Sequence, residues 1–226
     1  MSETMVVQRL RIHYAVEGPM RYVSVLDQGR IWERLLRRAG IPLAYTQGYN
    51  PRPRLQLGTA LPVGYGSDCE FIDLFLSATI APEALAQAIE AQLPLGLKVH
   101  AVKEVPLKAA AVQSRVRQAF YEVRVWTDEG SAQDSGANIQ QAIDTLLARA
   151  EIPRQRHKKG RLVDYDLRPL ILDIRYHLQH DNCHLLLMRL RAGPQGSGRP
   201  EEVLDELGLA DGRYRIQRRE LVLAEE

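Results

Sequence analysis

The segment Tyr45–Arg54 is the densest group of side chains able to do chemistry. It reads YTQGYNPRPR and combines two tyrosines and two arginines with an Asn-Pro step. The two prolines fix their own φ and favour extended backbone at Asn50 and Arg52, so the arginines are held in a defined direction. Tyrosine rings stack on bases, and guanidinium groups bind phosphate in two-pronged fashion. The segment is therefore a candidate RNA or phosphate site, the alternative being a turn whose tyrosines pack on the preceding helix. Its candidate residues are Tyr45, Gln47, Tyr49, Asn50, Arg52 and Arg54.

A second candidate is the basic run Arg154–Arg161, with five lysines and arginines in eight residues. Lys158-Lys159-Gly160 is expected at the tip of a loop. Clustered cations of this kind are typical of surfaces that bind phosphate backbones. A solvated charged loop is the alternative. The candidate phosphate-binding residues here are Arg156, Lys158, Lys159, Arg161 and the downstream Arg168.

Two further side chains are weak candidates for catalysis. Asp27 and Arg30 are three residues apart on an expected helix, where they share a face and can pair. An acid in a first helical turn is ordinary, so a structural role for Asp27 is favoured. His13, on an expected strand, is the other candidate.

The Gly-rich segment Gly193–Glu202 leads into an expected helix whose first turn carries Glu201 and Glu202. These acids already complement the helix dipole and would repel an anion. The segment is therefore interpreted as a structural connection.

Metal-binding patterns are absent from the sequence. The six histidines include no HExxH, and the two cysteines form no CxxC. His177, His180 and His184 surround an expected hairpin turn, where exposed histidines are a better interpretation than a zinc site. The sequence thus predicts that the chain binds neither a metal nor another cofactor.

Composition bounds the class of protein. The chain has 226 residues, 45% of them hydrophobic and 26% charged, close to the averages of globular proteins. The formal net charge is only +2, so any nucleic-acid surface must be a local patch. Two cysteines are too few for a disulfide scaffold or for an iron–sulfur cluster held by three or four thiolates. Without a secretory signal or an apolar run near 20 residues, the chain is expected to be cytoplasmic and not bound to membranes.

The predicted strands and helices that position the candidate residues occur in an order that is repeated in the two halves of the chain. Residues 6–16 alternate as a half-buried strand, and residues 24–39 change to helical spacing. The first 105 residues or so are expected to form strand, helix, strand, strand, helix and strand, and the second half repeats that order. The predicted fold is α+β, with two ferredoxin-like βαββαβ units in tandem and helices packed on one face of each antiparallel sheet. The expected domains are residues 1–106 and 119–226, joined by a connecting segment, 107–118.

Several blocks of this sequence are similar to a bacterial family of uncharacterised proteins known as radical-SAM-associated or radical-SAM-linked. They are Ser24–Asp27, Arg37–Pro53, Ala60–Gly64, Lys158–Gly160, Asp166–Pro169 and Gly193–Glu202. One departure is Val25, where the family pattern has His. The resemblance implies a chain that occurs beside, or fused to, a radical-SAM protein, often near genes for ribosomal proteins and ribonucleases. It supplies no catalytic residues.

Two functional hypotheses follow from these observations. In the first, the chain is a non-catalytic accessory module that binds RNA, ribosomal or transfer RNA being the expected kinds, and/or a radical-SAM enzyme partner. In the second, it is a metal-independent RNA-processing enzyme with Asp27 or His13 in the active site. The first hypothesis is favoured, because the sequence shows no other residues that would complete an active site with Asp27 or His13.

Overall fold

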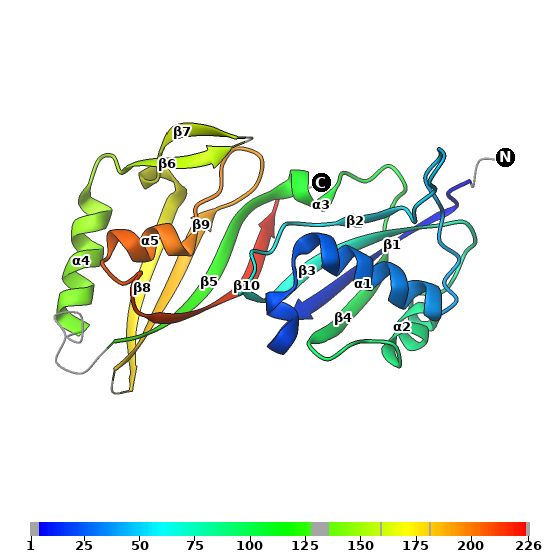
Figure 1. Ribbon diagram of the computed structural model, residues 1–226, viewed down its shortest axis with the longest axis horizontal. Helices are drawn as coiled ribbons and strands as arrows, with labels where there is room; N and C mark the ends of the chain where they lie inside the picture. The colour runs from blue at the N-terminus through cyan, green and yellow to red at the C-terminus, as the bar shows by residue number, and fades with distance from the viewer. Residues whose placement is uncertain (1–4, 128–135, 159, 181, 225–226) are drawn as a thin grey trace. The chain divides into compact units, whose positions relative to one another are not determined.

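The computed structural model describes residues 5–127, 136–158, 160–180 and 182–224. The chain divides into two compact units, Met1–Arg115 (unit 1) and Val116–Glu226 (unit 2). Both combine antiparallel strands with helices, so the fold is α+β as expected (Figure 1). None of the described helices is long and apolar enough to cross a bilayer.

Unit 1 contains four described strands in one antiparallel arrangement, together with helices. Strand β1 pairs with both β3 and β4, and β2 pairs with β3, every pair being antiparallel. The strand order is therefore β4-β1-β3-β2. Its elements are β1 (Gln8–Val16), η1 (Gly18–Tyr22), α1 (Val25–Arg38), β2 (Leu55–Leu57), β3 (Gly66–Leu76), α2 (Pro82–Glu90), β4 (Leu97–Glu104) and α3 (Val112–Arg115).

The core of unit 1 lies between the sheet and the helices α1 and α2 (Figure 1). Leu10 and Ile12 of β1 are completely buried, as the alternation predicts. Tyr14 on the same face meets the buried Trp32 of α1 edge to face, with ring centroids 5.0 Å apart. The Ser24 hydroxyl caps α1 by accepting a hydrogen bond from the backbone N–H of Asp27.

The other face of this sheet holds a buried ion cluster. Arg9 and Arg11 both bind the Asp73 carboxylate, at 2.5 and 2.6 Å. Arg9 also donates a 2.5 Å hydrogen bond to the carbonyl of Ala109, beyond β4. The sequence suggested that Arg9 and Arg11 lie on the polar face of a half-buried strand. Arg9 is instead only 2% exposed, because it anchors the segment that follows β4.

Unit 2 has the same order of elements with one insertion. Its main sheet has the order β10-β5-β9-β8, and all neighbours are antiparallel. Strands β6 and β7 form a separate two-stranded sheet, inserted in the chain between α4 and β8. Its elements are β5 (Val116–Trp126), α4 (Gly136–Ala148), β6 (Pro153–Lys158), β7 (Arg161–Asp166), η2 (Arg168–Leu170), β8 (Ile171–His180), β9 (Cys183–Arg191), α5 (Pro200–Glu206) and β10 (Arg213–Leu223).

One local expectation needs correction. The basic run 154–161 is not a plain loop, because its first residues form β6 and pair with β7 around a turn at Gly160, where φ is +76°. The division between the two units, after Arg115, lies within residues 107–118, a segment that contains α3 and the first residues of β5.

Candidate nucleic-acid interface

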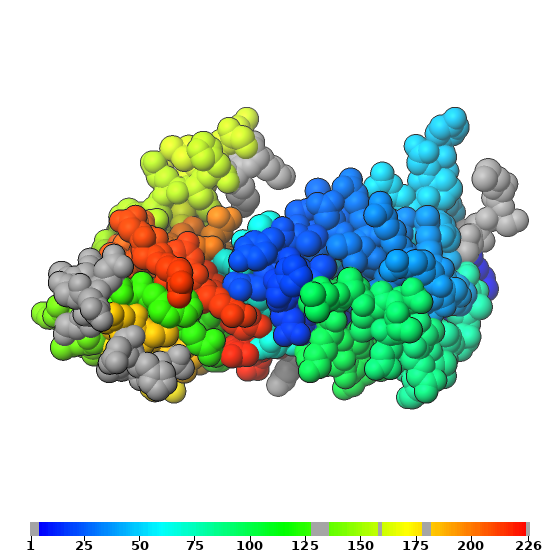
Figure 2. Space-filling model, turned by 60° about the horizontal axis from the view of Figure 1, so that its bottom comes forward, coloured from blue at the N-terminus to red at the C-terminus, as the bar shows by residue number. Residues whose placement is uncertain are grey.

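Residues 45–54, here called the tyrosine arm, form a small hairpin that leaves unit 1. Its two sides are joined by hydrogen bonds from the N–H of Thr46 to the carbonyl of Arg52 and from the N–H of Arg54 to the carbonyl of Ala44, both 2.8 Å long. The N–H of Arg52 also donates to Thr46 Oγ1 at 3.0 Å. At the tip, Gly48 has φ of +124°, which an L side chain rarely adopts. Figure 2 shows this segment in light blue, projecting from the unit.

The tip of the tyrosine arm presents its side chains to solvent. Tyr49 is 100% exposed, and Gln47, Asn50 and Arg52 are exposed as well. The Arg52 guanidinium has no hydrogen bond or ion pair within the described part of the chain. The tip is thus an ordered backbone whose aromatic, amide and cationic groups are all accessible.

The base of the tyrosine arm behaves differently. Arg37 of α1 lies over the Tyr45 ring at 5.9 Å, so the alternative of packing on the first helix holds for this tyrosine. Arg54 lies 4.9 Å from the centre of the Phe75 ring, and Arg9 lies 5.1 Å from the same ring. Tyr45 therefore supports the arm, whereas Arg54 is exposed beside the Phe75 ring and remains a candidate together with the four tip residues.

Strands β6 and β7, residues 153–166, are here called the basic hairpin. Its base is held by Arg154, which binds Asp205 at 2.6 Å and Glu206 at 2.9 Å. Burial disfavours the charged guanidinium and acts to lower the pKa of Arg154. The hydrogen bonds to the Asp205 and Glu206 carboxylates outweigh this effect, so the pKa is raised. Arg156 lies over the Tyr165 ring at 4.5 Å and donates to the carbonyl of Ser197.

Arg168 contributes to folding rather than to an open surface. Its guanidinium donates to the carbonyl of Leu147, near the end of α4, at 2.9 and 3.1 Å, and to the carbonyl of Ile171 at 3.0 Å. The contacts to Leu147 satisfy a carbonyl in the last turn of α4, which has no partner within the helix. Arg156 and Arg168 are accordingly left out of the candidate interface.

The remaining candidates are Lys158, Lys159 and Arg161. Lys158 ends β6 opposite Arg161, which is exposed at the start of β7. Lys159, the other candidate, lies outside the described residues. Next to the tip, Leu162 and Val163 are 56% and 39% exposed.

The two weak catalytic candidates are not brought together. His13 lies on the sheet face opposite α1 and stacks on Phe71, with ring centroids 4.9 Å apart. Burial, followed by repulsion from His100, lowers the pKa of His13. Asp27 lies in the first turn of α1, paired with Arg30 at 2.7 Å. Hydrogen bonds from Ser24 and Arg30 lower the pKa of this exposed carboxyl.

Asp27 is also remote from the tyrosine arm. Arg37, which contacts the base of the arm, is ten residues further along α1, so about 15 Å of helix separates the two. The geometry does not join Asp27, His13 and Arg52 into one site.

The hairpin histidines show one error of the sequence interpretation. His184 is fully buried rather than exposed, with Tyr176 Oη 2.9 Å from Nδ1 and Thr127 Oγ1 3.1 Å from Nε2. A Cβ at Gly136 would collide with the Tyr176 hydroxyl, so α4 begins directly against this group. In the part of the chain that the structure describes, no three His, Cys, Asp or Glu side chains are placed to hold a metal ion.

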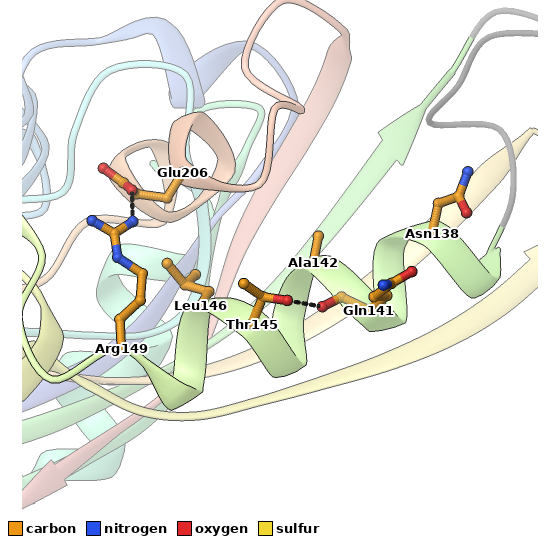
Figure 3. A pocket seen from close by; sticks show the side chains of 7 residues that line it. All are labelled: Asn138, Gln141, Ala142, Thr145, Leu146, Arg149 and Glu206. Atoms are coloured by element: carbon orange, nitrogen blue, oxygen red, sulfur yellow. Dashed lines mark hydrogen bonds and ion pairs between the residues drawn. The ribbon is translucent and has the colours of Figure 1, made fainter.

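Two pockets of unit 2 are lined by described residues that do not form a catalytic set. One of about 350 Å³ lies between α4 and Glu206, and its Arg149 is already bound to Glu206 at 2.7 Å (Figure 3). Another, of about 810 Å³, lies at the base of the basic hairpin and includes Glu151, Asp164 and Asp166. These carboxylates disfavour an anionic ligand. Burial and the nearby Glu202 carboxylate raise the pKa of Tyr165, beside them, to about 12.

The structure brings together one group of basic and aromatic side chains that the sequence analysis did not identify. Arg124 and Trp126 of β5 lie on the same face of the main sheet as Arg213 and Arg215 of β10. The available signal was the alternation of arginines in the last strand, which indicates one basic face.

Comparison with solved structures finds distant likenesses. A crystal structure of a Cbf5-Nop10-Gar1 complex matches with a TM-score of 0.48 and 11% identity, over 95% of this chain and 50% of that chain. A structure of an H/ACA RNP bound to a substrate RNA containing 2'-deoxyuridine matches with a TM-score of 0.47 and 9% identity, over 92% and 47%. An unknown protein from Galdieria sulphuraria has a TM-score of 0.27 and 11% identity, over 93% and 98%. The chain spans about half the length of the first two structures.

No curated protein matches the chain. A family model described as an uncharacterized protein conserved in bacteria (DUF2344) matches residues 9–200. That range includes the tyrosine arm, the basic hairpin and the segment up to the start of α5. The chain therefore belongs to this family of uncharacterized bacterial proteins.

Proposed function

We propose that this chain is a non-catalytic accessory module that binds RNA through the tips of the tyrosine arm and the basic hairpin. The observation that carries the proposal is the full exposure of Tyr49 on a hydrogen-bonded arm. Three residues away, the guanidinium of Arg52 has no ion pair or hydrogen bond with any described residue. A ring held this way is ready to stack on an unpaired base, and the guanidinium to bind the adjoining phosphate.

The basic hairpin supports the same proposal. Arg154 and Arg156 fix its base through carboxylates and the Tyr165 ring, so the cations at its tip are carried by an anchored element. Lys158, Lys159 and Arg161 would add phosphate contacts that do not depend on sequence.

We also propose that both units are ferredoxin-like, as the order of their elements led us to expect. The strand orders β4-β1-β3-β2 and β10-β5-β9-β8 support this, since each corresponds to the order 4-1-3-2 of a βαββαβ unit. In unit 2 the basic hairpin is an insertion between the first helix and second strand of that pattern.

The partner is proposed to be a separate radical-SAM enzyme acting on ribosomal or transfer RNA in the cytoplasm. Similarity to the radical-SAM-associated family supports this pairing. The two cysteines also mean that a cluster held by three thiolates must be supplied by another chain. The alternative of a metal-independent RNA-processing enzyme with Asp27 or His13 in the active site is not favoured, because Asp27 is paired with Arg30 and is remote from the tyrosine arm.

The test is a salt titration of RNA binding. Replacing Lys158 and Lys159 together by Ala should flatten the slope of log affinity against log salt by about 1.4, at ~0.7 for each single-strand contact. Tyr49→Ala should weaken binding at every salt concentration, because about 1–3 kcal/mol of base stacking is lost. Arg52→Ala should weaken it too.

The matched control is Arg34→Ala, which removes an exposed arginine of α1 and should leave the affinity unchanged. Absence of RNA binding at micromolar protein and low salt, or equal binding by all these variants, would contradict the proposal.

A further inference from the structure

In the described part of unit 2, both helices lie on the same face of the main sheet (Figure 1). Val123, Leu186 and Met188, which alternate with the side chains of the opposite, open face, are almost completely buried. The open face is here called the arginine face and is defined on β10, β5 and β9. Its members are Arg213, Arg215, Trp126, Arg124, Glu122, Leu185 and Leu187.

The strand register arranges these side chains in rows. Arg213 is opposite Trp126, and its guanidinium lies 4.6 Å from the centre of the Trp ring. In the next row, Arg215 is opposite Arg124, which is followed across β9 by Leu185. Neighbouring strands are about 4.8 Å apart, so each row is one continuous surface.

The arginine face carries more positive than negative side chains. Arg215 and Arg124 are directly opposite, an arrangement of like charges that destabilises a sheet. Glu122 binds Arg124 at 2.5 Å and also Arg219 at 2.6 Å, so one carboxylate serves two arginines. Arg213 and Arg215 are exposed and have no ion pair with any residue that the structure describes. Folding does not require this excess of positive charge, whereas an anionic ligand would use it.

The same face also offers apolar surface. Leu187 of β9, opposite Glu122, is 38% exposed, and Leu185 and Trp126, in the next two rows of the face, are partly exposed. The solvent side of an antiparallel sheet is normally polar. A mixture of arginines with an accessible Trp and aliphatic side chains instead suits a ligand that alternates phosphates with flat rings.

We propose that the arginine face binds a single-stranded segment of RNA, with a base stacked on Trp126 and phosphates bound by Arg213 and Arg215. This deepens the proposed RNA-binding function and rests on it, but it uses a surface separate from the two tips. Antiparallel sheets with one open face are a known platform for unpaired RNA bases.

The chain carries a natural probe for this surface. It has two tryptophans; Trp32 is completely buried, so RNA-dependent quenching of fluorescence reports on Trp126. Titration with a single-stranded oligouridine at low salt should quench the emission. Anisotropy of a labelled copy of the same oligonucleotide measures total binding independently.

Three variants sharpen the test. Trp126→Ala should weaken oligouridine binding by about five- to a hundredfold, the loss of one stacked base. Trp126→Phe should abolish the quenching and weaken binding less, because a ring remains. Joint replacement of Arg213 and Arg215 by Ala should reduce the salt slope by about 1.4. The control, Arg34→Ala with Lys98→Ala, removes the same charge from exposed positions of unit 1 and should change neither readout.

The outcomes separate this inference from the proposed function. RNA binding that depends on Tyr49 and Arg52 but gives no Trp quenching would overturn the arginine face and leave the two tips standing. If anisotropy detects no binding of the labelled oligouridine, both the arginine-face inference and the proposed RNA-binding function are overturned. Equal quenching by polyglutamate at equal charge would show an acidic-protein site and overturn the RNA assignment. Quenching by oligouridine alone, lost in the double arginine variant, is the expected result.

Discussion

Arginines of similar appearance in the sequence have two different roles in this protein. Arg9 and Arg168 donate to backbone carbonyls, and Arg154 binds two carboxylates. Arg52 and Arg215 are exposed, with no ion pair to any residue that is described. The first group contributes to stability, and we expect the second to contribute to binding.

Arg168→Ala should lower the free energy of unfolding by about 2 kcal/mol, since it removes charged hydrogen bonds to the carbonyls of Leu147 and Ile171. Urea denaturation measures this. Arg161→Ala is the control, because this exposed side chain should change stability by less than about 0.5 kcal/mol. Equal effects of the two variants would show that the contacts of Arg168 do not stabilise the fold.

The pKa of His13 should be below 6.5 in the folded protein, where burial and the neighbouring His100 disfavour the charged ring. The folded state then binds fewer protons than the unfolded state, so stability should fall as pH decreases below 6.5. An NMR titration of the ring gives the pKa directly. His100→Gln should raise it, because a repelling charge is removed; a pKa at or above 6.5 would refute the assignment.

At the scale of elements, the tyrosine arm and the β1–β3 pairing depend on specific polar contacts. The arm is held by hydrogen bonds between its two sides, including the one that Thr46 Oγ1 accepts from Arg52. The back of the unit 1 sheet is held by one carboxylate, Asp73, between Arg9 and Arg11. These contacts can be weakened separately.

Thr46→Val should loosen the tyrosine arm, because it deletes the acceptor for the Arg52 N–H while keeping the shape of the side chain. Amide hydrogen exchange at Arg52 should accelerate, and RNA affinity should fall about fivefold for the loss of ~1 kcal/mol of ordering. Thr46→Ser keeps the hydroxyl and should behave as the wild type. Unchanged exchange in the Val variant would mean that the arm is ordered by other contacts.

Asp73→Ala should destabilise unit 1 by about 3–5 kcal/mol, since two arginines would lose their shared, buried counter-charge. Chemical denaturation compares it with Glu33→Ala, which breaks the more exposed pair with Arg37 and should cost about 0.5 kcal/mol. Similar losses for both variants would indicate that Arg9 and Arg11 find other partners.

At the scale of the whole molecule, charge is distributed unevenly in a nearly neutral chain. The formal net charge is +2, yet cations gather at the basic hairpin and on the arginine face. An RNA-binding role must therefore operate through these local surfaces rather than through an overall positive charge.

Tagged protein purified from its native host should bring down RNA and a separate iron–sulfur protein. Because this chain has only two cysteines, EPR signals from a reduced cluster in that sample should follow the partner chain and vanish when it is removed by high salt. A cluster signal that stays with this chain alone would contradict the proposed division of labour.

Several features could be predicted from the sequence alone. Alternation in β1 and β9 and helical spacing in α1 determine which side chains are buried, because each period directs apolar groups to one face. The prolines and glycine of residues 45–54 likewise predict an exposed, conformationally restricted segment. The α+β class follows from such local patterns.

Other features required the tertiary structure. The sequence predicts Arg156, in the basic run, and Arg168, downstream of it, as phosphate ligands. In the structure Arg156 contacts the Tyr165 ring and the Ser197 carbonyl, and Arg168 donates to a carbonyl at the end of α4. His184 is buried beside two hydrogen-bonding partners that the local sequence does not reveal. Tyr176 lies on the neighbouring strand β8, and Thr127 is distant in the sequence. The arginine face exists only because the register of β10 on β5 brings Arg215 beside Arg124 and Arg213 beside Trp126. Charge is a property of single residues, whereas its availability depends on partners that only folding brings within reach.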